Sequence, residues 1–159
     1  MSVELEVNGQ IYNYPENRES PSWGEDASAW AVAVTDVLGS VVGPGDIVLT
    51  AASIANNQAS PTNVVGLAFD TTSVRGALVE YAIYRVTTGG GATELAEMGS
   101  MYLAYKSTAA SWELAVVGLT NAGVTFSVTN TGQVQYTSTN ITGSSYSGTI
   151  KFRARAIPQ

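Results

Sequence analysis

The chain has 159 residues and a formal net charge of −6, contains neither histidine nor cysteine, and is charged at only 13% of its positions. Without imidazole or thiol groups it cannot form a Ser-His-Asp triad, a cysteine nucleophile, a disulfide, a thiolate zinc site or a histidine-ligated haem, and we expect no cofactor or metal. The acidic balance argues against a nucleic-acid partner, and no apolar run approaches the roughly 18 residues that a membrane span needs.

The first part of the chain predicts a β-hairpin followed by one helix. Val3–Val7 alternates apolar and acidic residues, Asn8-Gly9 fits a tight turn, and Gln10–Tyr14 can return as the second strand. A turn-rich connector over 15–24 leads to residues 25–38, which have helical periodicity. The apolar positions at this spacing are Trp30, Val34, Val37 and Leu38.

Charge separates this part from the rest. A break at residues 43–46 predicts a boundary between an acidic N-terminal arm, 1–46, and a body, 47–159. The arm holds eight acidic residues against Arg18, a net charge of −7, whereas the body holds six basic and five acidic residues, a net charge of +1. Two segments with different surroundings are indicated: the arm is either solvated or meets the basic part of a neighbouring copy. Acidic residues after Met1, in place of a basic signal region, predict synthesis in the cytoplasm.

The body reads as a series of short strands between turn residues. Such strands at this spacing predict a mainly β fold, with about eight antiparallel strands in a β-sandwich or jelly-roll-like body or a barrel. The candidates are Ile47–Ile54, Val64–Phe69, Ala77–Thr88, Thr93–Met98, Met101–Lys106, Trp112–Val117, Val124–Val128, Gln133–Ser138 and Thr149–Ile157.

The last candidate strand alternates apolar residues with Lys151, Arg153 and Arg155. We call these three residues the basic row, because alternate residues of a strand share a face at a spacing of about 7 Å. Like charges so close need counter-charge or solvent. The row either docks onto an acidic surface, for which the arm of a neighbouring copy is one candidate, or is a solvated face whose Arg stems lie over apolar surface.

The aromatic residues offer further candidates. Trp23, Trp30 and Trp112 are too scattered for a base-stacking platform and are expected to be core or interface anchors. Together with the basic row, Trp23 and Trp30 form the predicted interface set. Four tyrosines on adjoining strand candidates form either an aromatic recognition face for glycan or protein, or cross-strand packing pairs. They are Tyr81, Tyr84, Tyr102 and Tyr105.

Two carboxylates, Glu94 and Glu97, are the candidates for a glycosidase pair. Three residues apart in a strand, they are expected to point to opposite faces, so surface placement is the favoured interpretation. A carboxylate-based glycan hydrolase or lyase is therefore the least favoured function, and no catalytic residue is predicted.

Several strings resemble small virion structural proteins of tailed bacteriophages. They are Val7–Pro15, Pro21–Glu25, the Ala-rich segment around Trp30, Val79–Arg85 and Gly148–Ala156. The resemblance implies a β-rich module on a virion, either a capsid decoration (cement) protein or a piece of a tail fibre or spike. Decoration proteins of this kind are commonly homotrimers with an arm that reaches over the capsid.

We therefore expect a non-enzymatic structural protein that covers and stabilises seams between major capsid subunits. Its expected partners are other copies of itself, as a homotrimer, and the major capsid protein or other virion proteins. The alternative is a receptor- or glycan-binding module of a tail fibre or spike. A long fibre would need repeats or a coiled coil, and neither pattern is present in the sequence.

Overall fold

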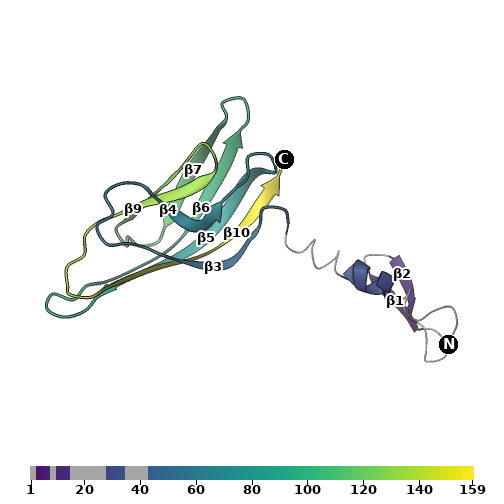
Figure 1. Ribbon diagram of the computed structural model, residues 1–159, viewed down its shortest axis with the longest axis horizontal. Helices are drawn as coiled ribbons and strands as arrows, with labels where there is room; N and C mark the ends of the chain where they lie inside the picture. The colour runs from purple at the N-terminus through teal and green to yellow at the C-terminus, as the bar shows by residue number, and fades with distance from the viewer. Residues whose placement is uncertain (1–2, 8–9, 15–27, 35–42) are drawn as a thin grey trace. The chain divides into compact units, whose positions relative to one another are not determined.

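The computed structural model of the chain describes residues 3–7, 10–14, 28–34 and 43–159 (Figure 1). It divides the chain into two compact units, Met1–Gly43 and Pro44–Gln159. Within the described residues, no helix is long and apolar enough to cross a membrane.

The first unit contains the predicted hairpin strands and part of the predicted helix. β1 (Val3–Val7) pairs with β2 (Gln10–Tyr14) in antiparallel register, and a helix covers residues 28–34. The period-2 pattern and the helical spacing therefore predicted these elements correctly. The Asn8-Gly9 turn, the 15–24 connector and the expected helix ends lie outside the described residues.

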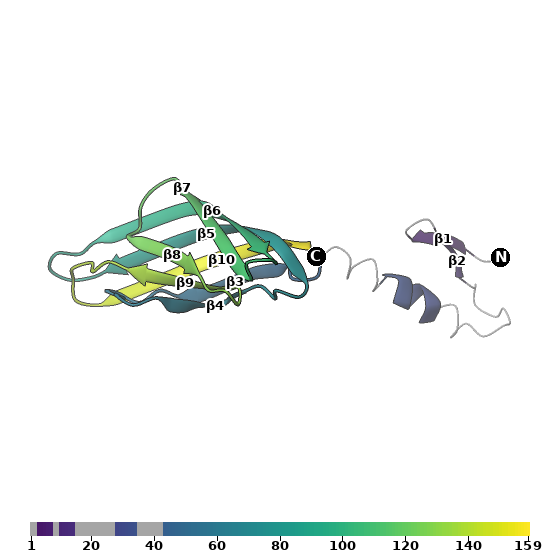
Figure 2. The same ribbon diagram turned by 90° about the horizontal axis from the view of Figure 1, so that it is seen from above.

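The second unit is a β-sandwich of two antiparallel sheets, which confirms the predicted mainly β fold. A five-stranded sheet has the order β3-β10-β5-β6-β7, and a three-stranded sheet with the order β4-β9-β8 covers one of its faces (Figures 1 and 2). The strands are β3 (Ile47–Ser53), β4 (Thr62–Ala68), β5 (Val74–Thr87), β6 (Glu94–Lys106), β7 (Ser111–Gly118), β8 (Val124–Val128), β9 (Gln133–Ser138) and β10 (Tyr146–Pro158).

One sequence prediction about the strands was wrong. Thr93–Met98 and Met101–Lys106 are not two strands but parts of the single strand β6, which pairs with β5 without a break. Gly99 marks a close approach rather than a turn. It lies opposite Tyr81, and a Cβ at Gly99 would be 2.6 Å from the Tyr81 hydroxyl oxygen. The same Cβ would be 2.4 Å from the Val117 backbone carbonyl oxygen on β7. Glycine is therefore required because this carbonyl and the Tyr81 side chain together occupy the space around it.

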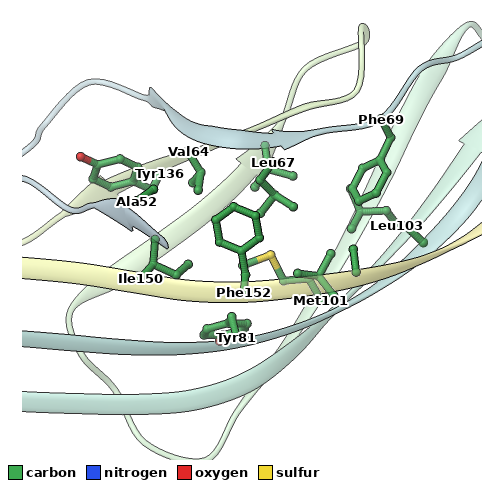
Figure 3. Close-up of a cluster of buried hydrophobic side chains, with 14 of the residues drawn as sticks. Ala52, Val64, Leu67, Phe69, Tyr81, Met101, Leu103, Tyr136, Ile150 and Phe152 are labelled. Carbon is green, nitrogen blue, oxygen red and sulfur yellow. The ribbon is translucent and has the colours of Figure 1, made fainter. Parts of the chain in front are cut away.

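The hydrophobic core lies between the two sheets. Alternate residues of β5, β6 and β10 point toward β4 and β9, and Figure 3 shows the side chains of both layers interdigitating. Phe152 and Leu67 are 1% and 0% exposed, and Met101 is equally buried. Burial on this scale is the main stabilising contribution in such a fold.

Trp112 is a core anchor, which is one of the two roles predicted for the tryptophans. Its ring centroid lies 6.0 Å from that of Phe69 and 5.2 Å from that of Tyr105. Gly132 packs against the same cluster with a φ of +85°, and a Cβ there would be 2.0 Å from the Phe69 carbonyl oxygen. Trp112 Nε1 is buried and has no hydrogen-bond partner within the described residues. The contribution of Trp112 is therefore apolar packing.

Candidate interaction surface

The five-stranded sheet packs one face against the three-stranded sheet, and its other face has no second sheet over it within the described residues 44–159. We call this second face the outer face. Alternation along the strands places its side chains: on β5 the exposed residues Leu78, Glu80 and Ala82 alternate with buried ones, and on β6 Met98 and Tyr102 are exposed. A face of this kind in a sandwich is a surface on which another protein can pack.

The basic row lies on the outer face. Lys151, Arg153 and Arg155 are all exposed, and the residues between them are buried, as the alternation predicts. Arg153 Nε donates a hydrogen bond of 2.6 Å to Glu80 Oε2, and the two residues are direct partners in the register of β10 and β5. Lys151 and Arg155 form no ion pair or side-chain hydrogen bond with any described residue. The row thus brings three cations together with one carboxylate.

The half of the outer face over β6 and β7 carries a group of exposed apolar side chains, near the ion pair of Lys106 with Glu113. Met98 is 62% exposed, Val117 is 60% exposed and Leu119, just beyond β7, is 82% exposed. Tyr102 lies between Leu78 and Ala115 in the register. The outer face therefore carries large apolar side chains beside a basic row, and monomeric proteins seldom leave such a combination uncovered.

The four tyrosines do not form one recognition face. Tyr81 is 2% exposed and Tyr105 is half-buried against Trp112, so both belong to the core side of the sheet. Tyr84 and Tyr102 are on the outer face, but Tyr102 pairs with Leu78, six positions before Tyr84 along β5. Tyr81 and Tyr105 thus pack in the core, whereas Tyr84 and Tyr102 are two separated aromatic side chains on the outer face.

Glu94 and Glu97 lie on opposite faces of β6, as their spacing predicts. Glu94 is exposed. Desolvation, and secondarily the nearby Glu94 carboxylate, raises the pKa of the Tyr84 hydroxyl. Glu97 is 8% exposed and accepts two hydrogen bonds of 2.7 Å, from the Tyr81 hydroxyl and from the Ala122 backbone N–H. The two carboxylates therefore cannot flank one bond of a substrate.

A buried arginine that sequence reasoning missed organises one end of the sandwich. Arg85 is 0% exposed. Its guanidinium donates hydrogen bonds of 2.6 Å to the carbonyl oxygens of Ala122 and Thr139, and longer ones to Asn56 Oδ1 and the Tyr146 hydroxyl. None of these partners is a carboxylate, so the buried charge is balanced by the dipoles of neutral groups. We call this set of contacts the Arg85 network.

The Arg85 network connects the loops at that end of the sandwich to one another. The Ala122 carbonyl accepts from Arg85 while the Ala122 N–H donates to Glu97, so one loop residue lies between the two buried charges. Backbone hydrogen bonds join the same loops directly, as from Thr139 N to Gly123 O and from Asn57 N to Thr139 O. The result is an end held by many polar contacts. No charged residue is present in the four loop segments that form this end of the sandwich, which are 54–61, 88–93, 119–123 and 139–145.

The two tryptophans of the predicted interface set belong to the first unit. Trp23 lies outside the described residues. Trp30 lies in the helix over residues 28–34, and its side chain is half-buried. The structure thus unites Lys151, Arg153 and Arg155 on one surface, whereas the participation of Trp23 and Trp30 in an interface stays a prediction.

Comparisons with known proteins add little to this geometry. No family model matches the chain, and no curated protein sequence matches it. Among solved structures, it is similar to the Acinetobacter phage vB_ApiP_P1 tailspike protein, at 13% identity and a TM-score of 0.34. The similarity covers 71% of this chain and 21% of the tailspike chain, so the chain spans about a fifth of that protein. A likeness this weak carries no argument, and the phage resemblance rests on the sequence strings.

Proposed function

We propose that the chain is a non-enzymatic structural protein of a tailed-bacteriophage virion, which acts by packing its outer face against neighbouring protein. The observation that carries the docking role is the combination of large exposed apolar side chains and a basic row on one sheet face. The chain also lacks the imidazole and thiol groups on which most hydrolytic active sites depend. The virion location is supported by the sequence strings that resemble phage structural proteins.

Within a virion, capsid decoration is the position we favour. A cement protein gains free energy by covering seams between capsid subunits, for which it needs surface complementarity rather than a reactive centre. A standard interface of roughly 800 Å² per partner is enough for stable docking, and a homotrimer multiplies it through avidity. The sandwich body supplies a sheet face for this purpose, and the chain has no repeat that would extend it into a fibre.

The docking role is tested by sedimenting the purified protein with intact virions and, separately, with empty capsids. We expect Val117→Glu on the outer face to lower the bound fraction at least about tenfold, because a charge would be desolvated in an apolar contact. Val65→Glu is the matched control, since Val65 is 74% exposed on β4 of the other sheet. Equal binding by the two variants would falsify the docking role of the outer face, and binding to tails rather than capsids would reject decoration.

The alternative function, a receptor- or glycan-binding module of a tail fibre or spike, is favoured by a different feature. The loop end held by the Arg85 network is uncharged and rich in Asn, Thr and Ser side chains, such as Asn57 and Asn140. Amide and hydroxyl groups on a rigid framework suit the hydroxyls of a neutral sugar. A glycan array discriminates the two functions, because a decoration protein should show no sugar preference.

A further inference from the structure

We propose that the basic row binds acidic residues of the first unit of a second copy of this chain. The inference rests on the proposed docking role of the outer face, because it names the partner that part of this face takes. The contact is head-to-tail: the basic row of each copy binds one neighbour, and the acidic first unit of the same copy binds another.

The distribution of charge between the two units is the first argument. Residues 1–43 contain seven acidic residues and only Arg18 as a base, whereas residues 44–159 contain six acidic and six basic residues. The whole excess of negative charge is therefore in the first unit. A surface with unbalanced positive charge on the second unit is its natural complement, because opposite potentials favour encounter and fix the register of two partners.

The surroundings of the basic row are the second argument. In register, Lys151 lies between Ala51 of β3 and Ala82 of β5, and Arg155 lies beside Leu78. Short or apolar neighbours leave the ammonium and guanidinium groups accessible, and Glu80 already bonds to Arg153. Two of the three cations thus have no carboxylate among the described residues and are open to one from outside.

The spacing of the acidic residues in β1 is the third argument. Glu4 and Glu6 are two positions apart in β1, the same interval that separates successive members of the basic row in β10. Since alternate strand residues repeat about every 7 Å, the two sets have matching periods. Glu4 and Glu6 therefore match two successive members of the basic row, Arg153 together with Lys151 or Arg155, and the free cation at the other end of the row is left for a further acidic residue of residues 1–43.

A contact between two different surfaces is heterologous, and it produces a ring when the rotation between copies closes. The expected homotrimer needs such a contact, because an isologous patch generates twofold rather than threefold symmetry. Individual exposed ion pairs are weak, so the association should be strongly salt-dependent and should gain most from repetition around the ring.

Mass photometry and analytical ultracentrifugation of the full chain test the proposal. The wild type should associate at about 0.05 M salt and dissociate toward 1 M, where the screening length falls to about 3 Å. Lys151→Glu/Arg155→Glu and Glu4→Lys/Glu6→Lys should each weaken association at least about tenfold, since attraction becomes repulsion. Arg75→Glu/Lys106→Glu is the control: it reverses two exposed cations outside the row, one of which, Lys106, is already paired with Glu113, and it should change association little.

Mixing the two charge-reversed variants gives the decisive result. Each variant has like charges on its own row and at positions 4 and 6, but between the two variants these charges are again opposite, so the mixture should form dimers of one copy of each when neither variant associates alone. A closed ring of three is not expected from the mixture, because it would contain one contact between two copies of the same variant. A monomeric wild type at low salt, a mixture that stays dissociated, or an oligomer indifferent to Lys151→Glu/Arg155→Glu would each overturn the proposal. The last outcome, combined with loss of virion binding by Val117→Glu, would reject this partner while leaving the docking role intact.

Discussion

Replacement of Arg85 by methionine tests how the sandwich is held together at its loop end. Methionine keeps the length and apolar packing of the stem but removes every guanidinium donor. The two hydrogen bonds of 2.6 Å, to the carbonyl oxygens of Ala122 and Thr139, are the main loss. A hydrogen bond to a charged group contributes about 1.5–3 kcal/mol, so we expect Arg85→Met to lower the free energy of unfolding by about 3–5 kcal/mol.

Equilibrium unfolding in urea, followed by tryptophan fluorescence, to which Trp112 contributes together with Trp23 and Trp30, and by circular dichroism, measures this change. Arg75→Met is the matched control, because Arg75 lies on the same strand but is exposed and makes one long hydrogen bond, 3.3 Å, to Ser107. We expect the control to cost less than about 1 kcal/mol. If Arg85→Met falls within about 1 kcal/mol of the wild type, the network does not stabilise the fold in the way its geometry implies.

Three other substitutions follow from the core. Burial, and secondarily Glu97, raises the pKa of Tyr81, so the contribution of Tyr81 to the free energy of unfolding should be full below pH 10 and fall as the pH rises further. Tyr81→Phe should reduce this loss of stability at alkaline pH, as measured by urea unfolding at a series of pH values. Phe152→Ala should lower the unfolding free energy by about 3–5 kcal/mol in the same assay. Gly132→Ala should lower the free energy of unfolding by at least about 2 kcal/mol, as measured by thermal melting. Gly90→Ala should lower it little, because a Cβ at Gly90 would have no atom within 4 Å.

The fold was largely predictable because short strands were marked by period-2 alternation and bounded by Gly, Asn and Ser. The sequence predicted the bounds of β8 and β9 as observed, and it placed the basic row on one face of β10. It failed at Gly99, because a glycine that makes room for groups on both neighbouring strands, the Tyr81 side chain and the Val117 carbonyl, looks the same in sequence as one that begins a turn.

The Arg85 network could be predicted only in part. Val79, Tyr81 and Ile83 are buried alternate residues of β5, and Arg85 continues the same parity, so the alternation alone places an arginine on the core face. Its partners could not be found this way. They come from loops whose backbone oxygens point at the guanidinium, and no residue type identifies a carbonyl group that will accept such a bond.

The long sequence separations in the Arg85 network have a consequence for how the sandwich folds and comes apart. The hydrogen-bonded partners of Arg85 lie 29 to 61 residues away along the chain, in three loops and at the start of β10, and these segments meet only after both sheets have formed. Contacts that close so many long loops should form after the rate-limiting step, so Arg85→Met should accelerate unfolding in stopped-flow experiments and leave the refolding rate nearly unchanged. On this expectation, the arginine lengthens the lifetime of the native state without speeding folding, and a long native lifetime is what determines the operational stability of a protein that cannot be refolded once it has unfolded.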